Sequence, residues 1–203
     1  MTTKGEKAAS TKARIITVAR SLFASRGYNG TSTEAVLEES KVSRGALYHH
    51  FETKEALFAA VLEEVEVDIT AATGRAKANT NDPVEALGVA FDSFLDMASE
   101  SEVRQIVLTD AHSVLGWQQW REIEDRHGLG RLKQALKVVA AAGRIREAMV
   151  DVFAHILLAS LLEVAFMVAR SPDPQAAAST GRKAMKELLE RLLTKSESDP
   201  NYS

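Results

Sequence analysis

Hydrophobic residues along this chain recur at intervals of three and four positions, and no stretch alternates between apolar and polar residues as a strand does. The pattern predicts a first helix over residues 10–26, ended by Gly27. A second helix is expected over residues 31–40, because Thr31 and Glu34 have capping-box spacing. We predict an all-α fold of about nine helices.

A short third helix is expected after Ser43, and Thr53 can cap the long helix that follows it. Farther along, Asp82 can cap a helix whose first residue is Pro83, where the missing N–H costs nothing. The remaining helices are expected over residues 102–113, 117–142 (bent around Gly128 and Gly130 and ended at Gly143), 149–170 and 174–194.

The helix expected over residues 149–170 is apolar almost all round its axis, so it must be covered on more than one side. The last helix carries small and apolar residues at alternating intervals of three and four, which is typical of a coiled-coil-like seam. These two helices could form a four-helix bundle with a second copy, or both could pack inside a monomer. We favour the dimer, because a monomer of this size has difficulty covering both. The expected interface residues are Leu161, Ala178, Gly181, Met185, Leu188 and Leu192.

The stretch VSRGALYHHFETK, residues 42–54, places three polar rings in a row at positions 48–50. Metal binding is disfavoured, because helical metal ligands sit three or four residues apart, whereas adjacent residues diverge by about 100°. Leu47 and Phe51, four positions apart, would anchor one side of this helix in the core. The opposite side would then present polar groups outward, as in a helix that enters a DNA groove.

The residues on that outward side have chemistry suited to DNA. Arg44 can donate a bidentate pair to guanine, and Ala46 can touch a thymine methyl group. Gly45 lets the backbone approach closely, while Tyr48 and His49 can hydrogen-bond to phosphates. Each residue alone could equally be an ordinary solvated polar group, but the joint arrangement is harder to explain in that way. With the preceding helix, this helix predicts a helix-turn-helix.

Charge is distributed unevenly along the chain, which has a net charge of −3. Residues 1–55 hold nine Lys/Arg and six Asp/Glu, and the remainder holds 16 and 22. A basic head on an acidic body is typical of a phosphate-binding module joined to another domain, although ordinary fluctuation explains the difference about equally well. Lys54 in a first helical turn opposes the helix dipole, which a bound phosphate would explain.

Cysteine content, the N-terminal residues and the apolar runs of the sequence indicate where in the cell the protein works. The chain has no cysteine, which excludes disulfides and favours a reducing, cytoplasmic environment. The first residues lack the apolar stretch of a secretory signal. No membrane span is expected, because the longest apolar run, residues 152–169, is interrupted by His155, Ser160 and Glu163.

The run TSTEAVLEESKVSRGALYHHFETKEALF, residues 31–58, resembles the DNA-binding head of the tetracycline-repressor (TetR) family. The shared pattern is a Thr/Ser-rich start, then Val-Ser-basic-Gly-x-Leu-Tyr-x-His-Phe, then Lys three residues on. The resemblance implies a helix-turn-helix DNA-binding domain over residues 10–55 and a helical ligand-binding and dimerisation domain over 56–195. The terminal residues themselves predict disordered tails over 1–9 and 196–203.

The resemblance also implies roles for individual residues. Base edges would be contacted by Arg44, Gly45 and Ala46. Lys41 stands at the turn position where the family usually has glycine, so a left-handed backbone is expected there. The residues implied to contact phosphates are Thr33, Ser43, Tyr48, His49, His50 and Lys54.

For the whole protein, the resemblance implies a homodimeric repressor that binds a palindromic operator and is released by a small-molecule effector. An apolar or aromatic effector is expected, because four of the nine candidate pocket residues are Phe or Trp and two more are Met and Ile. His155 and Glu163 would point into this pocket or satisfy one another inside the bundle. The candidates are Phe91, Phe94, Met97, Ile106, Asp110, Trp117, Trp120, His155 and Glu163.

No cofactor, metal or enzymatic role is expected. Asp110, His112 and Ser113 are adjacent in sequence, whereas a catalytic triad is defined by geometry across the fold. Two alternatives stay open. One is a helical bundle that binds or converts a small molecule and whose head no longer binds DNA. The other is an architectural DNA-binding protein without an effector.

Overall fold

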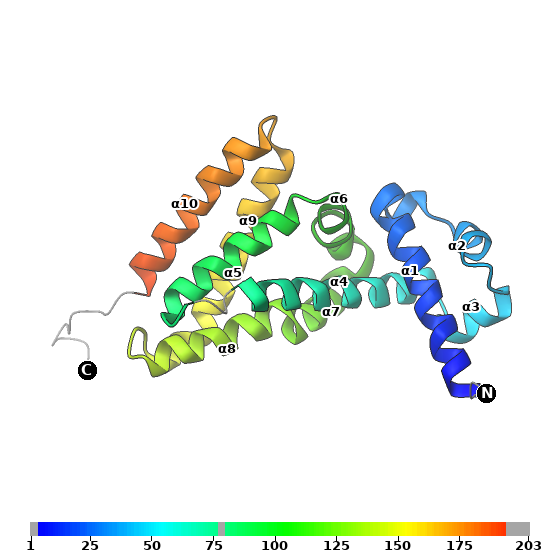
Figure 1. The fold of residues 1–203 in the computed structure, drawn as a ribbon, viewed down its shortest axis with the longest axis horizontal. Helices are drawn as coiled ribbons and strands as arrows, with labels where there is room; N and C mark the ends of the chain where they lie inside the picture. Colours follow the sequence, from blue (N-terminus) through cyan, green and yellow to red (C-terminus); the bar gives the residue numbers. More distant parts are fainter. Residues whose placement is uncertain (1–3, 77–79, 194–203) are drawn as a thin grey trace. The chain divides into compact units, whose positions relative to one another are not determined.

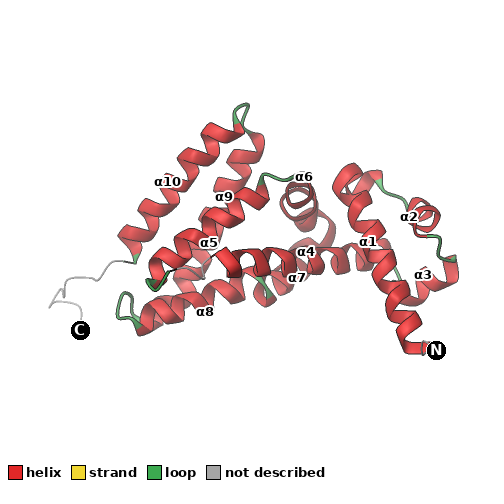
Figure 2. Ribbon diagram, in the orientation of Figure 1, coloured by secondary structure: helices red, strands yellow, loops and turns green. Residues whose placement is uncertain are grey.

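The computed structural model describes residues 4–76 and 80–193, and most of these residues are helical (Figure 2). The longer helices are α1 (Lys4–Gly30), α4 (Lys54–Ala76), α5 (Pro83–Ala98), α7 (Ala111–Arg126), α8 (Gly128–Ala141), α9 (Val150–Arg170) and α10 (Pro174–Leu192). The shorter ones are α2 (Thr33–Ser40), α3 (Arg44–His50), α6 (Ser101–Val103), the π-helix η2 (Arg104–Asp110) and the 3-10 helix η3 (Glu147–Met149). No strand occurs in the two described ranges, and the predicted all-α fold class is confirmed.

The chain divides into two compact units. The first comprises Met1–Glu66 and Glu100–Arg121, and the second comprises Val67–Ser99 and Glu122–Ser203. The DNA-binding head predicted over residues 10–55 lies within the first unit, which also contains α6 and η2.

The two predicted tails have different outcomes. Disorder over residues 1–9 is wrong from Lys4 onward, because α1 already begins there. Residues 1–3 and the tail predicted over residues 196–203 lie outside the described ranges.

In the first unit, α1 packs against α2, α3, α6 and η2 (Figure 1). Its apolar residues Ile15, Leu22 and Phe23 lie on one face and are buried. The Phe23 ring meets Phe58 of α4 edge-on, with ring centroids 5.2 Å apart. This apolar centre fixes α1 beside the start of α4.

The turns of the head follow local sequence signals, with one correction. Gly27 breaks α1 with a φ of 69°, and Lys41 has a φ of 56°, which confirms the left-handed turn predicted after α2. The side chain of Ser32 caps α2 by accepting from the N–H of Ala35, so the capping role predicted for Thr31 is wrong. The Thr31 hydroxyl instead donates to the carbonyl of Gly27 at 2.9 Å.

In the second unit, α9 packs against α5, α8 and α10, and α10 also packs against α5 (Figure 1). The start of α5 is as predicted, because the Asp82 carboxylate accepts from the N–H of Val84 at 2.8 Å and Pro83 occupies the first turn. The buried positions of α9 are Val150, Ala154, Leu157, Leu158, Leu161, Ala165 and Val168.

The small residues of α10 serve packing inside the chain. A Cβ at Gly181 would come closer than 3.0 Å to the Val164 side chain of α9, so the missing side chain lets the two helices approach each other. The dimer seam predicted along α10 therefore needs correction, because most of it faces the chain's own helices. Leu161, Ala178 and Met185 are buried in the single chain, whereas Leu188 and Leu192 are half-buried.

Candidate nucleic-acid interface

Helix α3 is held in the first unit by two apolar side chains. Leu47 is 1% exposed and Phe51 is 4% exposed, so the predicted anchoring of one side of this helix is confirmed. The Ser43 hydroxyl caps the helix by accepting from the N–H of Ala46 at 3.2 Å. Because seven residues make fewer than two turns of α-helix, these anchors leave the other flank free to face outward.

The outward flank carries residues predicted to contact DNA, Arg44 and Gly45 for base edges and Tyr48 for a phosphate. The side chain of Arg44 is 61% exposed, and Tyr48 is 40% exposed. No heavy atom lies within 4 Å of the position that a Cβ of Gly45 would occupy. A phosphate or base edge could therefore approach the backbone of α3 directly at this position.

Glu34 of α2 lies beside this flank, and no pattern in the sequence indicated that it contacts Arg44. The Nη2 atom of Arg44 donates to Oε1 of Glu34 at 2.9 Å, and both side chains are exposed. The pKa of the Glu34 carboxyl is held below its usual value, first by a hydrogen bond from the backbone N–H of Glu34 and then by hydrogen bonds from the side chains of Arg44 and Thr33. The hydroxyl of Thr33 donates to the same carboxylate at 3.2 Å. The two helices of the motif thus meet through a charged pair on the candidate DNA face.

The structure gives Lys54 a role that differs from the predicted phosphate contact. Its ammonium donates to the carbonyls of Tyr28 at 2.8 Å and Thr31 at 2.9 Å. It also lies 3.9 Å from the centroid of the Tyr28 ring. Two carbonyl oxygens, which carry partial negative charge, compensate the positive charge in the first turn of α4, so no phosphate is needed to explain it.

The two histidines of α3 lie next to each other. Their rings are 5.2 Å apart in an edge-on arrangement, with His49 exposed and His50 half-buried. Across residues 4–76 and 80–193, no group of three or more His, Cys, Asp or Glu side chains is arranged to hold a metal ion.

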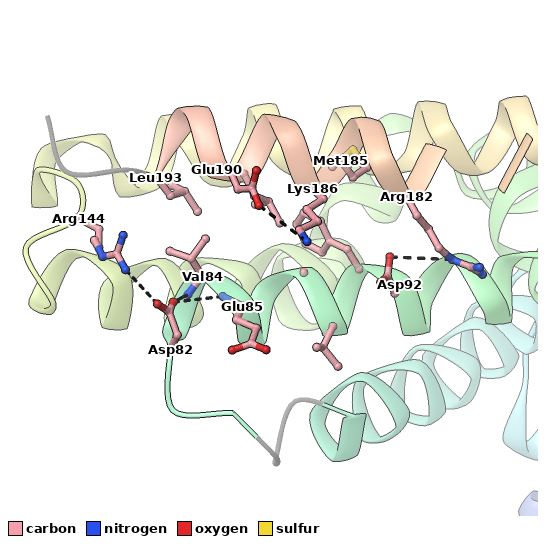
Figure 3. Close-up of a pocket in the computed structure, with 14 residues that line it drawn as sticks. Asp82, Val84, Glu85, Asp92, Arg144, Arg182, Met185, Lys186, Glu190 and Leu193 are labelled. Atoms are coloured by element: carbon pink, nitrogen blue, oxygen red, sulfur yellow. Dashed lines mark hydrogen bonds and ion pairs between the residues drawn. The ribbon is translucent and has the colours of Figure 1, made fainter. Parts of the chain in front are cut away.

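A cavity of about 490 Å³ lies in the second unit between α5 and α10 (Figure 3). Phe91, Met185 and Leu189 contribute apolar surface to it. At one end, Arg144 pairs with Asp82 at 3.0 Å.

At the other end of the cavity, Arg182 lies 3.9 Å from Asp92 (Figure 3). Arg182 also pairs with Asp96. Burial raises the pKa of Asp92, and nearby Asp96 adds to the rise while Arg182 opposes it. The cavity thus combines apolar surface with charged groups at both ends.

The residues predicted to line an effector pocket do not gather around this cavity. Phe91 lines it, whereas Phe94 and Met97 are half-buried elsewhere on α5. His155 and Glu163 are exposed on α9, so their predicted inward direction is wrong. The reason is that the apolar positions of α9 face α5, α8 and α10, which turns these two polar residues away.

Four other predicted pocket residues belong to the first unit. Ile106 is buried, and Asp110 is hydrogen-bonded to the end of α1, with its Oδ2 accepting from the Tyr28 N–H at 2.8 Å. Trp117 is 60% exposed, and its ring lies 5.3 Å from that of Trp120. The guanidinium of Arg121 lies over both indoles, 4.6 Å and 4.9 Å from their centroids. These tryptophans form a surface cluster with Arg121.

Comparison with known proteins identifies the class of protein. Residues 15–61 match the sequence model of bacterial regulatory proteins of the tetR family, and residues 84–192 match that of the tetracyclin repressor-like C-terminal domain. The second match alone covers more than half of the chain.

Relatives support both matches. The TetC protein of transposon Tn10 from Escherichia coli is 23% identical over 156 residues, which is 77% of this chain and 79% of TetC. The regulator QacR of Staphylococcus aureus is 47% identical over 51 residues, which is 25% of this chain and 27% of QacR. A TetR-family regulator from Pectobacterium atrosepticum has a similar structure, with a TM-score of 0.78, 31% identity and coverage of 95% of this chain and 98% of its own. This chain therefore belongs to the TetR family of DNA-binding transcriptional regulators.

Proposed function

We propose that this protein is a cytoplasmic repressor that binds a palindromic operator as a homodimer and is released by a small molecule. The observation that carries the proposal is the outward flank of α3, where Arg44 and Tyr48 are exposed while Leu47 and Phe51 are buried. A helix held in this way can enter the major groove, where arginine reads guanine and side-chain hydroxyls bind phosphates. The exposed chemistry is that of recognition, and the proposal includes no enzymatic step.

The proposed contacts follow from position on α3 and its neighbours. Arg44, Gly45 and Ala46 occupy the first turn of α3 and would face base edges. The residues proposed to contact phosphates are Thr33, Ser43, Tyr48, His49 and His50. Lys54 is left out of this set, because its ammonium already has two carbonyl partners.

The proposed dimer uses the outer face of α9 in place of the seam first predicted. Val152, Ile156 and Met167 are 51%, 44% and 62% exposed, and their spacing places them on one side of the helix. Only 33% of the apolar stretch of this helix is buried within the chain. A second copy of the same face would cover this surface, as in a four-helix bundle.

A membrane is the other apolar environment that could cover α9, since Glu147–Arg170 is long and apolar enough to cross one. The exposed side of α9 also carries His155 and Glu163, and a charged side chain is costly in lipid. At a protein interface, the same two residues can reach a polar rim. The mixed face of α9 therefore favours a second copy.

The cavity between α5 and α10 is a candidate effector site. Its volume of about 490 Å³ falls within the usual range for small-molecule pockets. An effector with an apolar body would contact Phe91 and Met185, and a polar group on it would reach Arg182 or Asp92. We therefore propose an amphipathic effector. Such a molecule has the apolar or aromatic part expected from the sequence and, in addition, a polar or charged group.

The proposal is tested by selecting duplexes from a random-sequence DNA pool with the wild-type protein. Enrichment of a palindrome is expected, and Arg44→Ala should weaken its binding about tenfold or more but weaken binding to a scrambled duplex only about threefold, the effect of losing one charge. Arg191→Ala, which removes an exposed arginine from α10, is the matched control and should bind as wild type. If the pool yields no preferred sequence, or if Arg44→Ala retains full selectivity, the proposal is wrong.

A further inference from the structure

The peptide groups of Tyr28, just after the break in α1, are held from both sides. The Tyr28 N–H donates to Oδ2 of Asp110 at 2.8 Å, and the Tyr28 carbonyl accepts from Nζ of Lys54 at 2.8 Å. Asp110 is the last residue of η2, and Lys54 is the first residue of α4. One residue of the backbone therefore connects η2 to the helix that directly follows α3.

Asp110 is buried and tightly packed at its end of this connection. Asp110 is 9% exposed, and the same Oδ2 atom also accepts from Nε2 of Gln105 at 3.0 Å. A Cβ at Gly27 would lie 3.0 Å from that nitrogen and 3.5 Å from Oδ2 of Asp110. The left-handed glycine thus permits the close approach that the hydrogen bond to Tyr28 requires.

The Lys54 side joins three helices of the head. Besides Tyr28, the ammonium of Lys54 binds the carbonyl of Thr31, a residue that is 1% exposed and that precedes the cap of α2. The end of α1, the start of α2 and the start of α4 therefore share one cation. Hydrogen bonds from a charged donor are stronger than neutral ones, so the ammonium of Lys54 holds these three helix ends together strongly.

A second connection joins α1 to α6, the short helix that directly precedes η2. The Nε and Nη2 atoms of Arg20 each donate to the carboxylate of Glu102 in α6 at 2.7 Å, a bidentate geometry. Residues 104–110 between these two connections form a π-helix, a rare conformation that is frequent at functional sites. The segment Ser101–Asp110 is thus fixed to the head at both of its ends.

We propose that Asp110 and Lys54 are positioning residues for operator binding, and that they act through the Tyr28 peptide groups. Together they fix the turn from which α2 starts and the first turn of α4, and α3 lies in the chain between these two points. Neither residue touches DNA in this proposal. The inference rests on operator binding through α3.

The competing role for Lys54 is direct contact with a phosphate, and the two roles differ in salt dependence. A lost phosphate contact makes the slope of log K against log salt shallower by about 0.9. A lost positioning contact lowers the affinity at an unchanged slope, because the same phosphates are still bound. The Kd is measured far below the thermal midpoint of every variant, so that all variants are folded and a loss of fold stability does not lower the measured affinity.

The experiment measures the Kd for the duplex selected by the wild-type protein, at several salt concentrations, with circular dichroism as the check of folding. Asp110→Ala and Lys54→Met should each weaken binding about tenfold, the factor expected for a lost hydrogen bond to a charged group. Asp110→Asn should stay within about threefold of wild type, because an amide oxygen can still accept from Tyr28 and Gln105. The matched control is Asp173→Ala, which removes a carboxylate that caps α10 and should leave the Kd unchanged.

The double variant Asp110→Ala, Lys54→Met should lose less than the sum of the two single effects, since both act on one turn. A shallower salt slope for Lys54→Met, wild-type affinity for Asp110→Ala, or equal losses for Asp110→Asn and Asp110→Ala would each overturn the inference.

If Asp110→Ala does not fold, Gln105→Ala takes its place, with about threefold weaker binding expected from the loosened carboxylate; unchanged binding would overturn the inference. Failure of the underlying function would look different, because wild-type protein would then select no duplex at all.

Discussion

Arg44 of α3 and Glu34 of α2 form an exposed ion pair, with Nη2 of Arg44 2.9 Å from Oε1 of Glu34. The pair places a negative charge next to the arginine that is proposed to read a base. We therefore expect Glu34 to have two opposed effects on DNA binding, because its charge would repel the phosphates while its carboxylate orients the guanidinium of Arg44.

The first prediction concerns this carboxylate. Glu34→Gln should tighten binding to a scrambled duplex by roughly threefold, because one charge that repels the DNA backbone is removed. Selectivity for the selected duplex should fall, because Arg44 loses its charged partner. Fluorescence anisotropy with both duplexes measures the two changes, and Glu187→Gln on α10 is the control for charge alone. Weaker binding to scrambled DNA would contradict the repulsive role.

The second prediction concerns the approach of α10 to α9. Gly181→Ala should destabilise the protein by about 1–3 kcal/mol, because the new Cβ overlaps Val164. Gly74→Ala in α4 is the matched control, since nothing lies within 4 Å of its Cβ position, and it should stabilise by about 0.4–1 kcal/mol. Denaturant unfolding gives both values. Adding Val164→Ala to Gly181→Ala should recover part of the loss, and a loss that does not depend on residue 164 would refute the contact.

The third prediction concerns the proposed dimer face. Ile156→Glu should produce a monomer in sedimentation experiments, because like charges would face each other across α9. Operator affinity should fall about 100-fold or more, since a monomer binds only one half-site. Val138→Glu introduces the same charge at an exposed valine of α8 and should remain dimeric. A dimeric Ile156→Glu variant would move the interface away from this face.

The fourth prediction is a pH dependence at Asp82. Hydrogen bonds from the Val84 and Glu85 N–H groups, together with Arg144, hold the pKa of the Asp82 carboxyl below its usual value of 3.8. Because its pKa is lowered by folding, the ionised Asp82 carboxylate stabilises the folded state above pH 3.8. This stabilisation is lost as the pH falls through the pKa of Asp82 in the folded protein. The thermal midpoint of Asp82→Asn should therefore lie below that of wild type at neutral pH, and the gap should close in acid. A gap that widens below pH 3.8 would reverse the assignment.

The sequence by itself determined the features that depend on neighbours a few residues away. The helix break near Gly27 and the caps at Ser43 and Asp82 follow from local backbone chemistry. The left-handed turn at Lys41 was expected from the resemblance to the TetR family, which usually has glycine there. The buried side of α3 also followed from local spacing, because Leu47 and Phe51 stand one helical turn apart. The recognition motif was visible for the same reason, since it lies in one continuous stretch.

Only the tertiary structure decided which distant groups meet. Lys54 binds Tyr28 across 26 residues and Asp110 binds it across 82, and no periodicity in the sequence encodes such partners. The direction of the α10 seam and the outward placement of Glu163 likewise depended on which helix covers which face of α9. A helical pattern gives the angle between side chains around one axis, whereas the rotation of that axis against its neighbours is set by packing across the whole unit.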